Sequence, residues 1–250
     1  MFFKKNKTNK DYLLNLKPRT EGVLKFENYE VRYPDPQSIY YEYQDIFLNN
    51  IYNFKTEAKN PFIIDAGAFV GMSSLYFKSI YPNAHILCFE PDTKNFNLLN
   101  SNIKKNNLSD ISTFNVGIGK IKGKIKFYPD GNDGGDMFGV TDSKPIEVDI
   151  VQLSDFIDRE VDLLKMNIEG MEGDVFDNIA NKLGQIKEII FEYHCFEHLP
   201  QNLGNILQLL DKNNFQYVVR SLPIENTPLP FEFPKNYKYF NLVYAKNKTI

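Results

Sequence analysis

From residue 62 onward the sequence alternates between short apolar runs and segments whose apolar residues recur at helical spacing. The first run, Phe62-Ile63-Ile64, ends at Asp65-Ala66-Gly67, which is typical of a buried parallel strand followed by a tight turn. Four further core strands are expected at 85–89, 111–116, 163–166 and 188–193, and helices at 72–80, 92–103, 171–186 and 203–215. Strands separated by helices imply right-handed crossovers, so the fold class is α/β with a mostly parallel sheet and helices on both faces.

Two parts of the chain depart from this alternation. Strands expected at 122–128 and 147–153 flank a loop rich in Gly and Asp at 129–139, which we interpret as a flexible lid. Strands at 216–220 and 239–245 follow each other without a helix, so one antiparallel carboxyl-terminal strand should join the sheet.

The first 60 residues precede the α/β unit. They contain an expected strand or two within Gly22–Tyr33 and a helix around Ser38–Phe47. We therefore predict an N-terminal extension or cap at 1–60 and the main domain at 61–250.

Charge and cysteine content limit the classes of function. The chain has 29 Lys and Arg against 32 Asp and Glu, and this slightly acidic balance argues against a nucleic-acid partner. Its cysteines, Cys88 and Cys195, are too few for a disulfide framework or a four-ligand zinc site. No window approaches the roughly 18 consecutive apolar residues of a membrane span, and no signal peptide is evident. We expect a cytoplasmic protein.

Ligands of open α/β sheets bind outside the carboxyl ends of the strands, which directs attention to the first turn and the second strand end. Gly67 would let a ligand approach the backbone closely, and Gly71 opens the next helix. Glu90 follows the second strand, where an acid can accept both hydroxyls of a ribose.

The turn does not suit a phosphate. A G-x-G-x-x-G fingerprint aligned on Gly67 would need glycines where this chain has Asp65 and Val70. The Asp65 carboxylate would repel a pyrophosphate but would suit an ammonium group. A ligand with a ribose, an ammonium and no phosphate is S-adenosylmethionine. The alternative is that Asp65 merely caps the turn and Glu90 caps the next helix.

Three segments together resemble the FkbM family of methyltransferases: Ile64–Gly71, Phe89–Asp92 and Leu163–Glu172, the last with the pattern Leu-Lys-x-x-x-Glu-Gly-x-Glu. Val151–Ile157 and Phe191–His194 are also similar to that family. The resemblance implies a class I methyltransferase (Rossmann-like) fold. It also implies methyl transfer from S-adenosylmethionine to a hydroxyl oxygen, often of a sugar or a secondary metabolite.

The resemblance also implies the cofactor contacts. Asp65, Gly67, Ala68 and Gly71 would cradle the methionine side, and Ser73 would bond its carboxylate. Residues expected around the ribose and adenine are Glu90, Pro91, Asp92 and Asn115. Asn167 stands where the family usually has Asp; it is neutral and cannot be a base or a charged metal ligand, but it can still form hydrogen bonds. No metal site is expected.

An alcohol is a poor nucleophile until its proton begins to leave, so a base should lie at the end of the fourth or fifth strand. His194 is the first candidate because a neutral imidazole takes up a proton near pH 7. Glu169 is the second, and Glu172 and Glu192 are further candidates at the same strand ends.

These observations predict a methyltransferase that acts on a hydroxyl of a sugar or related small molecule, in surface-glycan or natural-product assembly. Its partner would be a small-molecule or glycan acceptor. Two alternatives stay open. The neutral Asn167 suggests a non-catalytic binding protein that keeps the fold, and an NAD-type oxidoreductase is disfavoured by the missing glycines.

Overall fold

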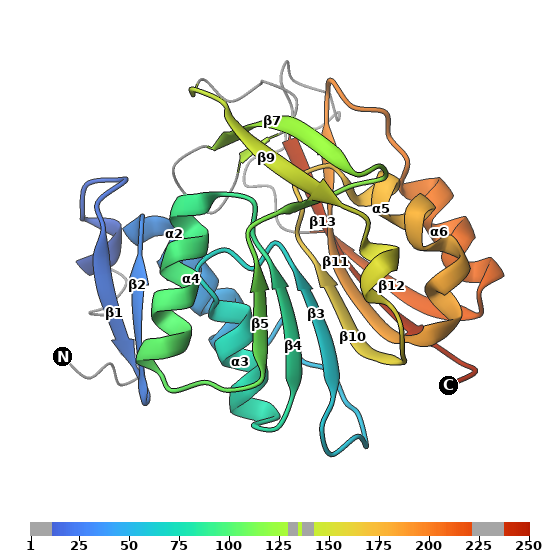
Figure 1. Ribbon diagram of the computed structural model, residues 1–250, viewed down its shortest axis with the longest axis horizontal. Coiled ribbons are helices and arrows are strands. Elements are labelled where there is room, and N and C mark those ends of the chain that lie inside the picture. Colours follow the sequence, from blue (N-terminus) through green and yellow to red (C-terminus); the bar gives the residue numbers. More distant parts are fainter. Residues whose placement is uncertain (1–11, 130–134, 137–142, 222–237) are drawn as a thin grey trace.

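A computed structural model describes residues 12–129, 135–136, 143–221 and 238–250 (Figure 1). The expected lid at 129–139 falls almost wholly outside the described residues. Within the described part, no helix combines the length and the apolar character that crossing a bilayer requires.

The centre of the molecule is a seven-stranded sheet in the order β12-β13-β11-β10-β3-β4-β5. The bounds of its strands are β3 Phe62–Ala66, β4 His85–Phe89, β5 Ile111–Phe114, β10 Val161–Met166, β11 Ile186–Phe196, β12 Phe215–Ser221 and β13 Lys238–Asn247. Neighbouring strands are parallel except at β13, which is antiparallel to both β11 and β12. The expected α/β class, with one antiparallel carboxyl-terminal strand, is confirmed.

Helices cover both faces of this sheet (Figure 1). On one face α3 (Met72–Ile80) and α4 (Thr93–Lys105) pack in one hydrophobic cluster, and on the other α5 (Glu172–Ile179) and α6 (Leu203–Lys212) pack in a second. The helix expected at 171–186 is shorter than predicted, because α5 passes into a 3-10 helix, η3, at Ala180–Gln185.

The N-terminal extension packs against the face that carries α3 and α4. It consists of the hairpin β1 (Gly22–Phe26) and β2 (Tyr29–Tyr33), α2 (Pro36–Glu42), and a π-helical turn, η1, at Tyr43–Leu48. Asn102 of α4 joins β2 to the sheet layer, since its amide donates to Arg32 O and its oxygen accepts from Arg32 N. The extension and the sheet layer share one hydrophobic cluster.

A small second sheet lies beyond the carboxyl ends of β3, β4 and β5 (Figure 1). It has the order β6-β9-β7-β8, with β6 Gly117–Ile118, β7 Gly123–Pro129, β8 Gly135–Asp136 and β9 Ile146–Val151. Its strands β7 and β9 agree with the extra strands expected from the sequence. A 3-10 helix, η2 (Leu153–Phe156), leads back to β10.

Candidate functional site

A cavity opens where β3, β4 and β10 end, beneath the second sheet. Its empty space is about 680 Å³, part of it open to solvent. It is lined by Glu42, Gly67, Phe69, Phe89, Glu90, Pro91, Asn95, Val116, Gly117, Ile118, Phe127, Asn167, Ile168 and Glu169. The predicted site residues among these are Gly67, Glu90, Pro91, Asn167 and Glu169.

The turn after β3 is built around Gly67, as expected. Its φ is 78°, and a Cβ at this position would lie 1.8 Å from the carbonyl oxygen of Asn167. Only glycine permits this approach of the β3 and β10 ends. Ala68 and Gly71 do not line the cavity. The Ala68 amide donates to Phe89 O, and Gly71, with a φ of 93°, starts α3, so both shape the turn.

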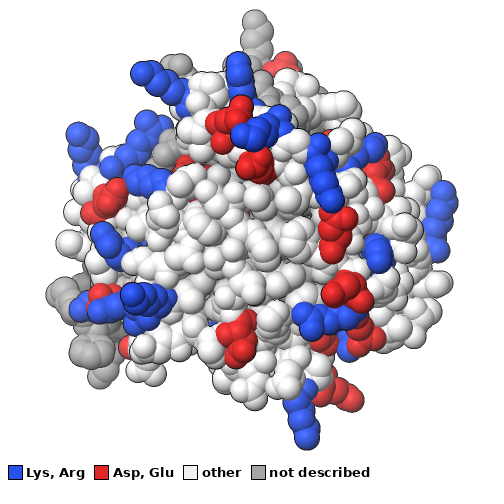
Figure 2. Space-filling model, in the orientation of Figure 1, with Lys and Arg blue, Asp and Glu red and all other residues white. Residues whose placement is uncertain are grey.

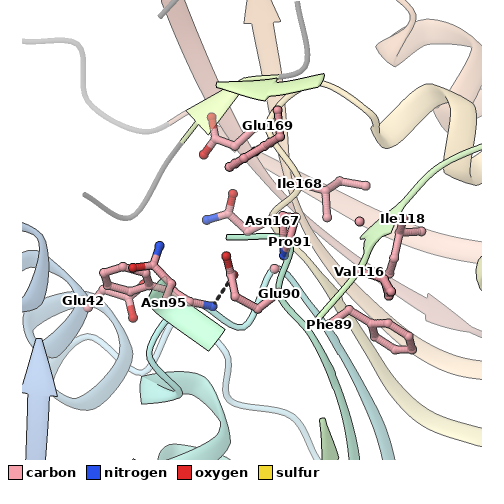
Figure 3. A pocket seen from close by; sticks show the side chains of 14 residues that line it. Glu42, Phe89, Glu90, Pro91, Asn95, Val116, Ile118, Asn167, Ile168 and Glu169 are labelled. Atoms are coloured by element: carbon pink, nitrogen blue, oxygen red, sulfur yellow. Dashed lines mark hydrogen bonds between the residues drawn. The ribbon is translucent and has the colours of Figure 1, made fainter. Parts of the chain in front are cut away.

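Glu90 occupies the cavity wall at the end of β4 (Figure 3). Its Oε2 accepts the Phe69 amide at 2.9 Å and its Oε1 accepts the Asp92 amide at 3.0 Å. Burial raises the pKa of Glu90 to about 8, although these two amides oppose the shift. Because each carboxylate oxygen has two lone pairs, one acceptor site on each oxygen is left for a ligand's hydroxyls.

Asp65 lies behind the cavity and not in its wall, which corrects the expectation that it meets an ammonium group of the ligand. The residue is fully buried, and its Oδ2 accepts the hydroxyls of Ser73 and Ser74. Lys165 Nζ lies 3.1 Å from Asp65 Oδ1 and 2.6 Å from Gly67 O. The protein's own lysine therefore neutralises Asp65, and Ser73 is engaged with Asp65 instead of lying in the cavity.

Asp92 and Asn115 hold the backbone that follows β4. Asp92 caps α4 by accepting the amides of Lys94 and Asn95, so the capping alternative that we weighed for Glu90 applies to Asp92. Asn115 donates to Glu90 O at 2.9 Å and to Pro91 O at 3.1 Å. Of Pro91, Asp92 and Asn115, only Pro91 reaches the cavity wall.

Asn167 contributes an unsatisfied acceptor. Its Oδ1 is buried and has no hydrogen-bond partner among the described residues. Figure 3 shows Asn167 and Glu90 facing the same space, with Phe89, Val116 and Ile118 on one side of it. Since buried acceptors are seldom left unpaired, this atom is suited to a donor group of a ligand.

His194 is buried between two carboxylates, which corrects its expected role as a neutral base. Its Nδ1 lies 2.8 Å from Glu172 Oε1, and its Nε2 lies 3.5 Å from Glu169 Oε1. Burial by itself would lower the pKa of His194, but the carboxylates of Glu169 and Glu172 outweigh it and hold that pKa well above its usual value. The two carboxylates on its ring nitrogens thus favour the imidazolium form, which has no lone pair to offer.

Glu192 accepts the hydroxyl of Tyr52 at 2.8 Å and does not line the cavity. Burial raises the pKa of Glu192, against the lowering effects of His194 and the Tyr52 hydroxyl. Of the residues expected as candidates for the base, only Glu169 reaches the cavity wall.

The cavity wall is acidic. Glu42, Glu90 and Glu169 line it, and no Lys, Arg or His is among its described lining residues. A wall with carboxyl groups and no basic side chain suits a cationic ligand better than a phosphate. No group of three His, Cys, Asp or Glu side chains in the described ranges is arranged to hold a metal ion.

Sequence reasoning missed a group of lining residues that reach the cavity from elements distant in the chain. They come from the N-terminal extension, α4 and the second sheet: Glu42, Asn95, Ile118 and Phe127. The alternating pattern of 122–128 signals a strand, but nothing local in it shows what the strand covers.

The chain matches the family model described as "Methyltransferase FkbM domain" over residues 65–217. It is similar to "Methyltransferase 1" of Beauveria bassiana, with 31% identity over 166 residues that cover 56% of this chain and 67% of that protein. It is also similar to "2-O-methyltransferase NoeI" of Sinorhizobium fredii, with 28% identity over 159 residues that cover 55% of this chain and 65% of that protein.

Solved structures agree on the fold. The methyltransferase FkbM structure from Methylobacillus flagellatus has a TM-score of 0.52 and 16% identity, over 82% of this chain and 47% of that one. The structure of M. jannaschii TYW2 in complex with AdoMet has a TM-score of 0.50 and 12% identity, over 92% and 87%. The family match covers more than half of the chain and confirms the resemblance of its motifs: this chain belongs to the FkbM methyltransferase family.

Proposed function

We propose that this protein transfers a methyl group from S-adenosylmethionine to a hydroxyl of a sugar or related small molecule, in surface-glycan or natural-product biosynthesis. The observation that carries the cofactor assignment is the acidic cavity wall at the carboxyl ends of the strands, with Glu90 fixed at the end of β4. A sulfonium with an attached ammonium suits such a wall, and a dinucleotide with a pyrophosphate does not.

The residues present fit this cofactor. Glu90 keeps acceptor sites for the two ribose hydroxyls, and the buried Oδ1 of Asn167 is available to a donor. Phe89, Ile118 and Phe127 supply an apolar wall suited to the adenine. When bound, this cofactor supplies a methyl group on a positively charged sulfur. The chain's contribution is to orient the acceptor hydroxyl and to exclude water.

The acceptor assignment is supported more indirectly. A relative carries the name 2-O-methyltransferase, and the family resemblance points to sugars and secondary metabolites. On the face shown in Figure 2, Lys and Arg are interleaved with Asp and Glu around the periphery, without the continuous basic surface that a nucleic acid prefers. A cytoplasmic location is consistent with Cys88 and Cys195, both free thiols.

Binding and transfer are tested together. Calorimetry should show binding of S-adenosylmethionine and S-adenosylhomocysteine but not of NADH. Methyl-labelled cofactor should then label one class in a panel of methyl glycosides, hydroxy acids and polyketide alcohols. Cofactor binding without any transfer would favour the non-catalytic alternative, and NADH binding without S-adenosylhomocysteine binding would favour the oxidoreductase.

A further inference from the structure

A row of three charged side chains leads from the protein interior to the cavity: Glu172, His194 and Glu169. Glu172 is the first residue of α5, His194 lies near the end of β11, and Glu169 is in the loop after β10. His194 Nδ1 is 2.8 Å from Glu172 Oε1, and its Nε2 is 3.5 Å from Glu169 Oε1. Glu172 Oε1 also accepts the Gly170 amide at 3.2 Å, which ties the loop to the helix.

The exposed fraction of these three side chains increases along the row toward the cavity. The side chains of Glu172 and His194 are 1% and 2% exposed, whereas that of Glu169 is 28% exposed and lines the cavity. His194 is further enclosed by the rings of Phe196 and Phe240. A ligand in the cavity can therefore reach Glu169 but not the other two residues.

The backbone of Glu169 has a conformation that residues other than glycine rarely adopt. Its φ is 55° and that of Gly170 is 98°, both in the left-handed region. A non-glycine residue in this conformation is strained and persists only when its surroundings hold it. Here the surroundings are the imidazole at the tip of Glu169 and the Gly170–Glu172 hydrogen bond.

We propose that Glu169 is the base that receives the proton of the acceptor hydroxyl, and that His194 and Glu172 are positioning residues that hold its carboxylate. This inference rests on the proposed function. In the step, a Glu169 carboxylate oxygen takes the hydroxyl proton and becomes a neutral acid. The hydroxyl oxygen forms its bond to the methyl carbon, and the electron pair of the broken carbon–sulfur bond stays on the cofactor sulfur. Glu169 then returns its proton to water.

His194 keeps both of its protons through this step. Its pKa is raised by the carboxylates of Glu169 and Glu172. Glu192 also interacts electrostatically with His194, and with Lys165 as well. A fixed imidazolium restricts the rotamers of Glu169, so that its carboxylate points at the acceptor when the acceptor binds.

The positioning role has a readout that needs no acceptor. The imidazole resonances of the protein with bound S-adenosylhomocysteine are followed by NMR, and the His194 signal is assigned by its loss in His194→Gln. At about pH 7.5 His194 should be an imidazolium. Glu169→Gln and Glu172→Gln should each move its titration downward by about one to three pH units. A neutral His194 in the wild-type protein, or a titration that neither variant moves, would overturn the proposal.

The catalytic role is measured with the acceptor from that panel that the wild-type enzyme methylates. Glu169→Gln should lower kcat by about 10²–10⁴-fold, a far larger change than its effect on the Kd for S-adenosylhomocysteine. His194→Gln should lower kcat by up to about 10²-fold through misplacement. Glu160→Gln, an exposed acid before the opposite end of β10, is the matched control.

The outcomes distinguish a failure of this inference from a failure of the proposed function. Glu169→Gln with wild-type kcat would overturn this inference and leave the proposed function intact. A wild-type enzyme that binds no S-adenosylmethionine or transfers no methyl group to any acceptor would overturn the proposed function, and this inference with it.

Discussion

Replacing Gly67 with alanine tests the way in which the β3 and β10 ends form the cavity. The added Cβ would lie 1.8 Å from the carbonyl oxygen of Asn167, well inside van der Waals contact. Because that atom belongs to the backbone, no side-chain rotation can relieve the overlap. The two strand ends must separate by more than an ångström, on a scale set by ordinary van der Waals contacts of about 3.5 Å.

Two terms set the size of the effect. A left-handed backbone, with φ at 78°, costs an alanine about 1–2 kcal/mol. Inserting a methyl group into a packed site costs about 1–3 kcal/mol more. The free energy of unfolding should therefore fall by about 2–5 kcal/mol. The Kd for S-adenosylhomocysteine should also rise, since Asn167 and the Gly67 carbonyl that Lys165 binds would be displaced.

Urea unfolding measures the first quantity and calorimetry the second. Gly123→Ala is the matched control, because a Cβ there would meet no atom within 4 Å and the residue lies in β7. We expect that control to stay within about 0.5 kcal/mol of the wild type. If Gly67→Ala unfolds at the same urea concentration as Gly123→Ala and binds the ligand equally well, the close approach of the strand ends is wrong.

Further outcomes concern single contacts. Glu90→Gln should weaken S-adenosylhomocysteine binding about 10- to 100-fold by calorimetry, since hydrogen bonds to a charged acceptor are lost. Because burial raises the pKa of Glu90 to about 8 and ribose hydroxyls favour its ionised form, wild-type binding should release protons below that pH. Calorimetry in buffers of different ionisation enthalpy detects this, and proton uptake would contradict it. Lys165→Met should lower the free energy of unfolding by about 3–5 kcal/mol because it leaves the buried Asp65 unpaired, and adding Asp65→Asn should restore much of it. Asn102→Ala removes its bonds to Arg32 and to the Val70 carbonyl, and urea unfolding should show a loss of about 3 kcal/mol; a loss below about 1 kcal/mol would contradict the joining role.

Local sequence patterns were sufficient to predict the order of the strands and helices and the position of the glycine turn. Strand and helix periods gave the order of the elements, and the run without a helix before 239–245 indicated the antiparallel β13. The position of Gly67 after an apolar run identified the turn that the structure shows. These features depend on backbone conformation and side-chain periodicity, which neighbouring residues largely determine.

The electrostatic environment of the buried site residues could be determined only from the tertiary structure. As a sequence feature, Asp65 is a free acid beside a ligand, but in the fold Lys165 pairs with its charge and the α3 serines donate to its Oδ2. His194 likewise has an ordinary local context, and only the approach of α5 and the β10 loop places it between two carboxylates that favour its protonated form. Electrostatic partners lie far away in the chain, so no local pattern indicates them.

By itself, then, the sequence determined the α/β framework, the glycine turn and the family to which the chain belongs. The tertiary structure decided which acids line the cavity: Glu42 arrives there from the extension, Glu90 from β4 and Glu169 from the β10 loop. The physical reason is that these two kinds of property depend on interactions over different distances along the chain. Backbone conformation is set over a few residues, whereas desolvation and charge pairing act between any groups that folding brings within a few ångströms.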